Sequence, residues 1–261
     1  MNEKNSPVLF IGHGSPMNAI LNNTFTQSLN SYPKTIDSPS AIIVFSAHWL
    51  TEGTYITGAK HPAQIFDFYG FPDKLYRIKY TPAGLPHLAR QIQSDNIGIN
   101  VDEKRGIDHA AWAILKHMYP NEDIPVLEIS LDVRKTPGEH FALAKELIKY
   151  RKENILFIGS GNIVHNLQVV DFDQNAKPYE WAVEMDNWLK NCIAAYDIEK
   201  LVNYTKYLKD YSLGMPTDEH YLPLLYTLGM KTAEDEIKTI HESVQNGSIS
   251  MRSLEISSNN K

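Results

Sequence analysis

Four short runs of apolar residues constrain the fold more than any other feature of the sequence. They span residues 8–14 (VLFIGHG), 41–49 (AIIVFSAHW), 125–131 (PVLEISL) and 155–162 (ILFIGSGN). Turn-forming residues bound each run, and continuous apolar runs of this length are typical of strands buried on both faces of a parallel sheet. We therefore predict an α/β fold in which residues 1–261 form a single domain, with a central, mostly parallel sheet flanked by helices.

Helical periodicity fills the gaps between these runs. Apolar residues at helical spacing predict helices over residues 108–120, after Pro137, over residues 181–196 and over residues 220–229. Asp108 is a suitable N-cap for the first of these helices. In the last one, Pro223 fits only in the first turn, and we expect Gly229 to end the helix in a left-handed conformation.

Two further segments have a different character. Residues 236–242 and 248–257 predict a closing pair of strands joined by the turn VQNGS at 244–248. Residues 59–86 are rich in proline, glycine and aromatic residues and lack clean periodicity. We expect this second segment to be an ordered loop that covers a site.

Charge and cysteine content exclude several classes of protein. A net charge of -6 at pH 7 offers no electrostatic footprint for a nucleic acid. Cys192 is the only cysteine, which excludes an internal disulfide framework and favours a cytoplasmic location. Residues 1–7 do not resemble a signal peptide, and no run approaches the roughly 20 apolar residues that span a bilayer. We expect no nucleic-acid or membrane partner, and a monomer or small homo-oligomer.

The ten histidines occur in two kinds of context. Five lie in loops or in ordinary helical positions: His61, His87, His117, His140 and His241. The other five follow predicted strands or begin predicted helices: His13, His48, His109, His165 and His220. The second group contains the candidate functional residues.

Three of these candidates, His13, His48 and His165, follow three predicted parallel strands. The carboxyl ends of such strands meet at one edge of the sheet, where ligands collect in α/β folds. Neutral imidazole is the commonest metal ligand in proteins, so the convergence predicts a zinc or iron site. The alternative for each residue taken alone is a structural histidine.

The remaining two candidates begin helices beside carboxylates. His109 follows Asp108, and His220 follows Asp218 and Glu219. These carboxylates are suited to orienting the rings or to joining them as ligands. The alternative is that the aspartates cap their helices and the histidines have no chemical role.

Five ordered motifs resemble those of the class III extradiol ring-cleavage dioxygenases of the LigB superfamily, and in particular its 4,5-DOPA dioxygenase-like branch. The motifs are GHGSPMN (12–18), SAHW (46–49), GIDHAAW (106–112), SGNIVHNL (160–167) and PTDEHYLPLLYTLG (216–229). The similarity runs from about Val8 to the tail at 248–256, nearly the whole chain. It implies the LigB-like version of the predicted fold and a catalytic domain over residues 1–261.

The resemblance also implies a reaction and a set of site residues. The reaction is the opening of a catechol ring by O2 to a semialdehyde, with a DOPA-like catechol and O2 as partners. One divalent metal ion, zinc as found in related proteins or Fe(II) for catalysis, would be bound by His13, His48, His165 and His220. His109 is the implied catalytic or substrate-orienting residue. His165 is a ligand in one reading and the acid/base in the other.

Aromatic residues near the predicted site suit two interpretations. They form a wall against the substrate ring, or they fill the core beneath the loop. The residues are Trp49, Phe66, Phe68, Tyr69 and Phe71.

Three other functions use the same histidines. A zinc hydrolase needs only a zinc-bound water that is nucleophilic near neutral pH. A metal-free binding protein on this scaffold needs no catalysis, and a structural zinc site needs a closed set of four ligands.

Overall fold

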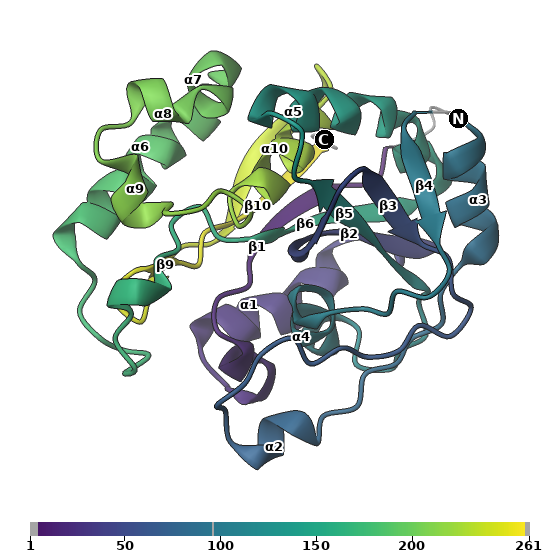
Figure 1. The fold of residues 1–261 in the computed structure, drawn as a ribbon, viewed down its shortest axis with the longest axis horizontal. Coiled ribbons are helices and arrows are strands. Elements are labelled where there is room, and N and C mark those ends of the chain that lie inside the picture. Colours follow the sequence, from purple (N-terminus) through teal and green to yellow (C-terminus); the bar gives the residue numbers. More distant parts are fainter. Residues whose placement is uncertain (1–4, 96, 259–261) are drawn as a thin grey trace.

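A computed structural model describes residues 5–95 and 97–258 of the chain. The first four residues of the segment 1–7, which we compared with a signal peptide, therefore lie outside the described part. The predicted α/β fold is confirmed, because a large, mostly parallel sheet lies between helices (Figure 1). None of the described helices is long and apolar enough to cross a membrane.

The central sheet has eight strands among the described residues, in the order β4-β3-β5-β2-β6-β1-β10-β7. Their bounds are β1 (Val8–Gly12), β2 (Ala41–Thr51), β3 (Thr54–Thr57), β4 (Ile99–Asp102), β5 (Val126–Asp132), β6 (Ile155–Gly161), β7 (Asp235–His241) and β10 (Ser253–Ser258). The four apolar runs of the sequence are β1, β2, β5 and β6, and these four are adjacent and parallel to one another in the centre of the sheet. Their carboxyl ends therefore lie along one edge of the sheet, as predicted.

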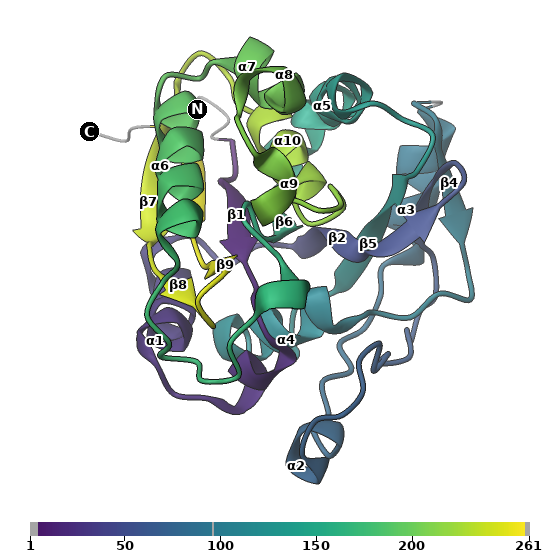
Figure 2. The ribbon, with the colours of Figure 1, turned by 60° about the vertical axis from the view of Figure 1, so that its left-hand side comes forward.

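The helices cover both faces of this sheet. The α-helices are α1 (Thr24–Ser31), α2 (Asp73–Tyr76), α3 (Pro86–Ser94), α4 (His109–Met118), α5 (Pro137–Glu146), α6 (Glu180–Ala194), α7 (Ile198–Val202), α8 (Tyr204–Tyr207), α9 (Tyr211–Gly214) and α10 (Leu222–Gly229). Short 3-10 helices are η1 (Pro16–Ile20), η2 (Tyr32–Thr35), η3 (Ile148–Glu153) and η4 (Leu167–Val169). Helices α1 and α4 pack on one face, whereas α3, α5, α6 and α10 pack on the other (Figures 1 and 2).

Strand β1 shows why the central strands are continuously apolar. Val8 and Phe10 belong to the core on the α10 side, and Leu9 and Ile11 belong to the core on the α4 side. Alternate side chains of a strand point to opposite faces, so a strand covered by helices on both faces needs apolar residues at every position. This burial holds the ends of β1, β2 and β6 rigidly in place.

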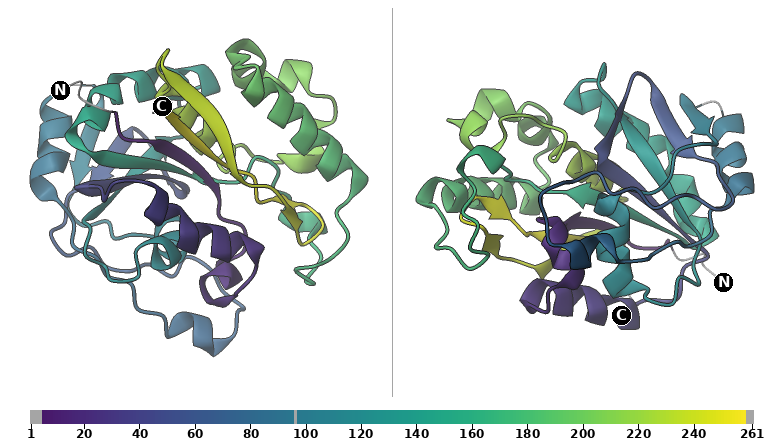
Figure 3. Two further views of the ribbon diagram at one scale, coloured as in Figure 1. Left: turned by 180° about the vertical axis from the view of Figure 1, so that it is seen from behind. Right: turned by 60° about the horizontal axis from the view of Figure 1, so that its bottom comes forward.

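The chain tail differs from the prediction in one respect. The expected pair exists, because β7 and β10 are antiparallel at the edge of the sheet, beside β1 (Figure 3). The turn at 244–248 does not join them directly. Asn246 and Gly247, with φ of 53° and 73°, instead close a separate small hairpin of β8 (Val244–Gln245) and β9 (Ile249–Ser250).

The expected role of Gly229 was wrong. This residue ends α10 without a left-handed φ, and Met230 continues in right-handed helical geometry. A Cβ atom at Gly229 would lie 2.5 Å from the carbonyl oxygen of Phe141 in α5. The glycine is required because two helices pack closely there. The other expectation for this helix is confirmed, since Pro223 lies in its first turn.

Candidate metal centre

Three of the candidate histidines bring their ring nitrogens together. The Nε2 atoms of His13 and His48 are 3.3 Å apart, and those of His48 and His220 are 3.2 Å apart. A ligand atom from each of the three residues lies within 4.8 Å of both others. His13 and His220 are only 3% and 7% exposed, so this is a largely buried cluster of nitrogen donors.

Local structure explains how the sheet presents the first two rings. His13 directly follows β1, and its backbone N–H donates to the carbonyl of Gly161 at the end of β6. His48 lies within β2 where the parallel pairing with β5 is interrupted between Phe45 and Leu50. An irregularity of this kind re-aims a side chain relative to the regular strand.

The third ring arrives from the start of α10. The carbonyl of His220 accepts a hydrogen bond of 2.8 Å from the backbone N–H of Asn162, just after β6. A Cβ at Gly161 would lie 2.1 Å from that carbonyl oxygen, and one at Gly159 would lie 2.3 Å from the carbonyl oxygen of Pro223. The two glycines of β6 therefore allow α10 to approach the sheet closely enough to place His220 beside the other rings.

Each ring uses its Nδ1 atom to bond an oxygen. His48 Nδ1 lies 3.0 Å from Asp67 Oδ2, and His220 Nδ1 lies 3.0 Å from Glu219 Oε1. For His13, the partner is Ser160 Oγ at 3.0 Å, and that hydroxyl donates its own hydrogen to the carbonyl of Ala110. The oxygen therefore accepts from His13. With all three Nδ1 atoms protonated as donors, the three Nε2 atoms keep their lone pairs.

This donor set fits a divalent metal ion. A tetrahedral ion with bonds of about 2.0–2.1 Å to histidine nitrogen separates its ligands by about 3.3 Å, which matches the two Nε2 distances. Imidazole whose second nitrogen bonds a carboxylate or another oxygen is the usual arrangement around zinc and iron. Three protein ligands also leave positions for a substrate.

The electrostatics of the cluster favour the neutral form of two rings, His13 and His220, and the charged form of His48. Burial, followed by the neighbouring imidazoles, lowers the pKa of His13 and of His220 well below the usual value. Burial also acts to lower the pKa of His48, but the hydrogen bond from its ring to Asp67 and the nearby carboxylates of Asp108 and Glu219 outweigh it and raise that pKa. A bound cation would supply the positive charge that these carboxylates favour.

His109 lies beside the three rings, on the first residue of α4. Asp108 caps this helix as predicted, accepting from the N–H of Ala110. The His109 ring is 4.1 Å from that of His48 and 5.5 Å from that of His13, measured between centroids. Its Nδ1 atom lies 2.9 Å from Asp67 Oδ1, so its Nε2 atom also keeps a lone pair. Burial lowers the pKa of His109, which favours the neutral ring.

His165 occupies a different position from the three clustered rings. It stacks on His220, with centroids 3.7 Å apart and planes tilted by 10°. Among the described residues, two groups of possible ligand atoms lie within 4.8 Å of one another, His13 with His48 and His220, and His48 with Asp67 and His109, and His165 belongs to neither group. Its part as a fourth ligand therefore stays a prediction.

The aromatic residues divide between the two interpretations made from the sequence. Phe66 and Phe68 pack against Trp112 of α4, and Phe68 also contacts the His109 ring edge-on at 5.4 Å. Trp49 is 5% exposed and lies under the guanidinium of Arg105, whereas Tyr69 is 93% exposed. Of the five, Phe68 is thus the one whose ring contacts a candidate catalytic residue.

Asp67 is the site residue that we did not identify from the sequence. Its carboxylate contacts both His48 and His109, although no periodic pattern or motif surrounds it. One signal was available. It is a lone acidic residue between aromatic residues, in a segment expected to cover a site.

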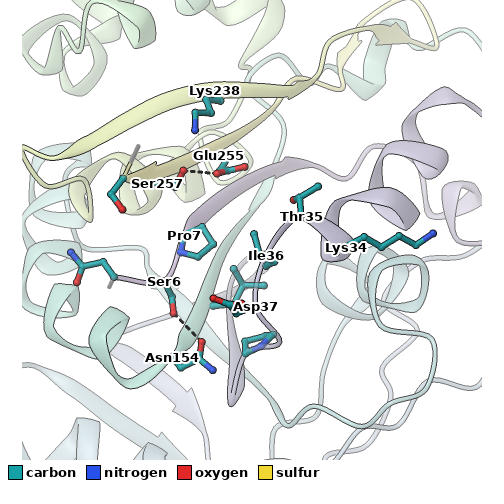
Figure 4. A pocket seen from close by; sticks show the side chains of 14 residues that line it. Ser6, Pro7, Lys34, Thr35, Ile36, Asp37, Asn154, Lys238, Glu255 and Ser257 are labelled. Atoms are coloured by element: carbon teal, nitrogen blue, oxygen red, sulfur yellow. Dashed lines mark hydrogen bonds between the residues drawn. The ribbon is translucent and has the colours of Figure 1, made fainter. Parts of the chain in front are cut away.

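One cavity of the protein lies away from the histidines. It measures about 440 Å³ and is lined by residues that precede parallel strands, including Pro7 before β1, Pro39 before β2 and Asn154 before β6 (Figure 4). It therefore opens at the amino ends of the strands, opposite the histidines. Ligands of α/β sheets bind at the carboxyl ends, so this cavity does not compete as the active site.

Comparison with known proteins identifies the family. The model of the family described as "Catalytic LigB subunit of aromatic ring-opening dioxygenase" matches residues 6–253. The chain belongs to the LigB family. As a LigB protein it is a metal-dependent aromatic ring-opening dioxygenase of the extradiol type, an oxidoreductase, and the function expected from the sequence is confirmed at this level.

Individual relatives cover nearly the whole chain of this LigB protein. A 4,5-DOPA dioxygenase extradiol of Escherichia coli (strain K12) is 39% identical over 262 residues, which cover 98% of this chain and 96% of the relative. A protein of the same name from Beta vulgaris is 34% identical and covers 95% and 96%. The crystal structure of an uncharacterized protein from Escherichia coli K12 has a TM-score of 0.83 at 36% identity, and the match covers 96% of this chain and 99% of that one. These relatives do not favour the hydrolase, binding-protein or structural-zinc alternatives.

Proposed function

We propose that this LigB protein cleaves a DOPA-like catechol, between one hydroxylated ring carbon and its unhydroxylated neighbour. Relatives named 4,5-DOPA dioxygenase extradiol, at 31–39% identity, support this substrate class. The observation that carries the proposal is the cluster of three Nε2 atoms at the carboxyl edge of the sheet, with His109 next to it. Both atoms of O2 enter the product, one in its aldehyde and one in its carboxyl group.

In this proposal His13, His48 and His220 hold the metal ion. When bound, a redox-active ion such as Fe(II) provides positions for the two catechol oxygens and for O2, which otherwise reacts slowly with closed-shell molecules. Fe(II) is thus the catalytic ion that we propose, while Zn(II) would fill the same donors without redox chemistry.

His109 and His165 move the protons. A neutral imidazole with a free nitrogen can accept a proton from a catechol hydroxyl and later return it to the opening ring. His109 meets this requirement, because Asp67 takes its Nδ1 hydrogen and burial disfavours its charged form. His165 is the second candidate, and its stacking on His220 supports an acid/base role more than a ligand role.

Hydrophobic contacts orient the substrate ring. Phe68 lies edge-on to His109, with ring centroids 5.4 Å apart, and it is therefore next to the residue that would accept the catechol proton. Aromatic side chains favour edge-to-face and offset contacts with other rings, so Phe68 can hold the substrate without a polar contact.

The test is anaerobic loading of metal-free protein with Fe(II) or Zn(II), followed by L-DOPA and O2. We expect one O2 consumed per ring opened, a yellow product with Fe(II), and no turnover with Zn(II). Hydrolytic activity of the zinc form, or no O2 consumption by the iron form with any catechol, would refute the proposal.

Variants can distinguish the residues that bind the metal from those that transfer protons. His13→Ala is expected to lose metal retention, whereas His109→Ala is expected to keep the metal and lose turnover. His165→Ala should retain metal if the residue is an acid/base and lose it if the residue is a ligand. His87→Ala, at an exposed position on α3, is the control and should behave like the unchanged protein. Loss of the metal from the His109 variant together with its retention by the His13 variant would reverse our assignment.

Three coarser expectations accompany this proposal. We propose that residues 1–261 form one catalytic domain and that it works as a monomer or small homo-oligomer. We also propose a cytoplasmic location, which the single, buried and unpaired Cys192 supports.

A further inference from the structure

The Asp67 carboxylate joins two rings that have different tasks in the proposed function. Its Oδ2 atom lies 3.0 Å from Nδ1 of His48, and its Oδ1 atom lies 2.9 Å from Nδ1 of His109. Oδ1 also accepts the backbone N–H of His109 at 3.1 Å. We propose that Asp67 is a positioning residue, which fixes the tautomer and orientation of the metal ligand His48 and of the proton-transfer residue His109 together. This inference rests on the proposed function for those two roles.

Hydrogen-bond chemistry makes a carboxylate the suitable group here. An ionised carboxylate only accepts, so both rings must carry their hydrogen on Nδ1 and keep the lone pair on Nε2. An amide of the same shape has one accepting oxygen and one donating nitrogen. It can therefore satisfy only one of the two Nδ1–H groups, and the other ring must turn or move its hydrogen to Nε2.

The loop that carries Asp67 is tied firmly to the start of α4. The N–H of Ile65 donates to the carbonyl of Ile107, and the N–H of Ile107 donates to the carbonyl of Ala63, both at 2.8 Å. The indole of Trp112 donates to the carbonyl of Ile65, also at 2.8 Å. These bonds fix the loop next to Asp67, and the bonds of its own carboxylate to His48 and His109 fix its side chain.

This arrangement couples the metal site to proton transfer. A hydrogen on Nε2 of His48 would occupy the lone pair needed for the metal. A hydrogen on Nε2 of His109 would prevent that nitrogen from accepting the catechol proton. The carboxylate of Asp67 excludes both of these tautomers, because it accepts the Nδ1 hydrogen of each ring.

The first measurement reads the tautomer of His109 directly. Long-range 15N–1H NMR of metal-free protein distinguishes the two ring nitrogens, at a pH about two units above the usual histidine pKa of about 6.5. The His109 signals are assigned by their loss in His109→Ala. We expect the Nδ1–H form in the unchanged protein. In Asp67→Asn, the amide oxygen can accept from only one of the two rings. In the molecules in which it accepts from His48, we expect His109 to shift toward the Nε2–H form.

The second measurement reads His48 through metal binding. Where the amide oxygen of Asp67→Asn serves His109 instead, we expect the affinity for Zn(II), from competition with a chelator, to fall about 10–100-fold. With the iron-loaded protein, kcat should fall at least about tenfold while KM for L-DOPA changes less than about twofold, because the substrate contacts are kept. The control is Asp73→Asn, an aspartate of the same segment whose side chain is 91% exposed and pairs only weakly with Arg77 at 3.8 Å.

The results for Asp67→Asn either support or refute the proposed positioning role. A changed His109 tautomer or a loss of zinc affinity in Asp67→Asn, with Asp73→Asn unchanged, supports the proposal. If Asp67→Asn keeps the tautomer and binds zinc within twofold of the unchanged protein, the proposal is refuted, even if its melting temperature falls. The tautomer and zinc-affinity measurements use no substrate. If Asp67→Asn changes the tautomer or the zinc affinity as expected but the unchanged iron-loaded protein opens no catechol ring, the proposed function is refuted and this inference is not.

Discussion

Replacing Gly161 with alanine should damage the metal centre without touching any ring. A Cβ at this position would lie 2.1 Å from the carbonyl oxygen of His220, whereas real Cβ atoms essentially never come closer than 3.0 Å to another atom. The start of α10 must therefore move away from β6 by at least 0.9 Å, the difference between these two distances. The 2.8 Å hydrogen bond from Asn162 to the same carbonyl would be lost or lengthened.

The size of this shift determines the expected effect. Metal sites tolerate errors of about 0.2 Å in ligand distance, so a shift of 0.9 Å removes His220 from useful contact. We expect Gly161→Ala to lower the affinity for Zn(II) at least about tenfold. Overpacking of a core typically costs about 1–3 kcal/mol, and each kcal/mol lowers the melting temperature by about 2–4 °C in a chain of this size.

The assay is a chelator competition for Zn(II) together with thermal unfolding of the metal-free protein. Gly138→Ala is the matched control, because a Cβ at Gly138, in the first turn of α5, would have no neighbour within 4 Å. That variant should bind zinc normally and be slightly more stable, because alanine favours the helix by up to about 1 kcal/mol. If Gly161→Ala binds zinc within twofold of the unchanged protein, the close approach of α10 does not position His220, and our reasoning fails.

Three further predictions concern buried polar groups. Burial lowers the pKa of His140 to about 4, so the unfolded chain binds a proton that the native protein does not between pH 6.5 and about 4. The free energy of unfolding should fall by up to about 3 kcal/mol as the pH falls through this window. If urea unfolding gives the same dependence on pH for the unchanged protein and for His140→Gln, this prediction is contradicted. Asp235→Ala should lower the free energy of unfolding at pH 7 by about 3–5 kcal/mol, because it leaves the fully buried guanidinium of Arg151 without its carboxylate partner. A loss below about 1 kcal/mol in urea titration would show that the charge of Arg151 is compensated in another way. Ser160→Ala removes the oxygen that accepts a hydrogen bond from His13, and it should lower the affinity for zinc about 10–100-fold in chelator competition. An unchanged affinity would mean that another group fixes the His13 ring.

The sequence predicted those parts of the fold whose burial is continuous. β1, β2, β5 and β6 are covered by helices on both faces, so their apolar runs stand out. β3 and β4 were not predicted, because each has only four residues and lies toward one edge of the sheet, where no long apolar run is needed. Gly229 was misread since a glycine near a helix end is usually a left-handed cap, and only the neighbouring helix reveals the close contact.

The candidate site was partly predictable for a related reason. His13 and His48 follow or lie in buried strands, so the chain itself shows that their rings are at one edge of the sheet. The link from Asp67 to His109 joins residues 42 positions apart and depends on how a loop without periodicity docks on α4. Nothing local in the sequence encodes that contact.

The charges around the cluster suit a bound cation, because burial lowers the pKa of His13 and His220 whereas nearby carboxylates raise the pKa of His48. A divalent ion bound by three imidazoles would keep its full charge, and the nearest carboxylates, Asp67 and Glu219, bond the outer nitrogens of the rings instead of the ion. These two carboxylates would balance the two positive charges of a bound ion from a distance, which would make the ion tolerable in a buried site. They also leave its remaining positions without protein anions. A catechol that loses one proton to His109, as we propose, would therefore bind as an anion without competing against a carboxylate ligand, so negative charge placed one contact away from a bound ion would favour this class of substrate.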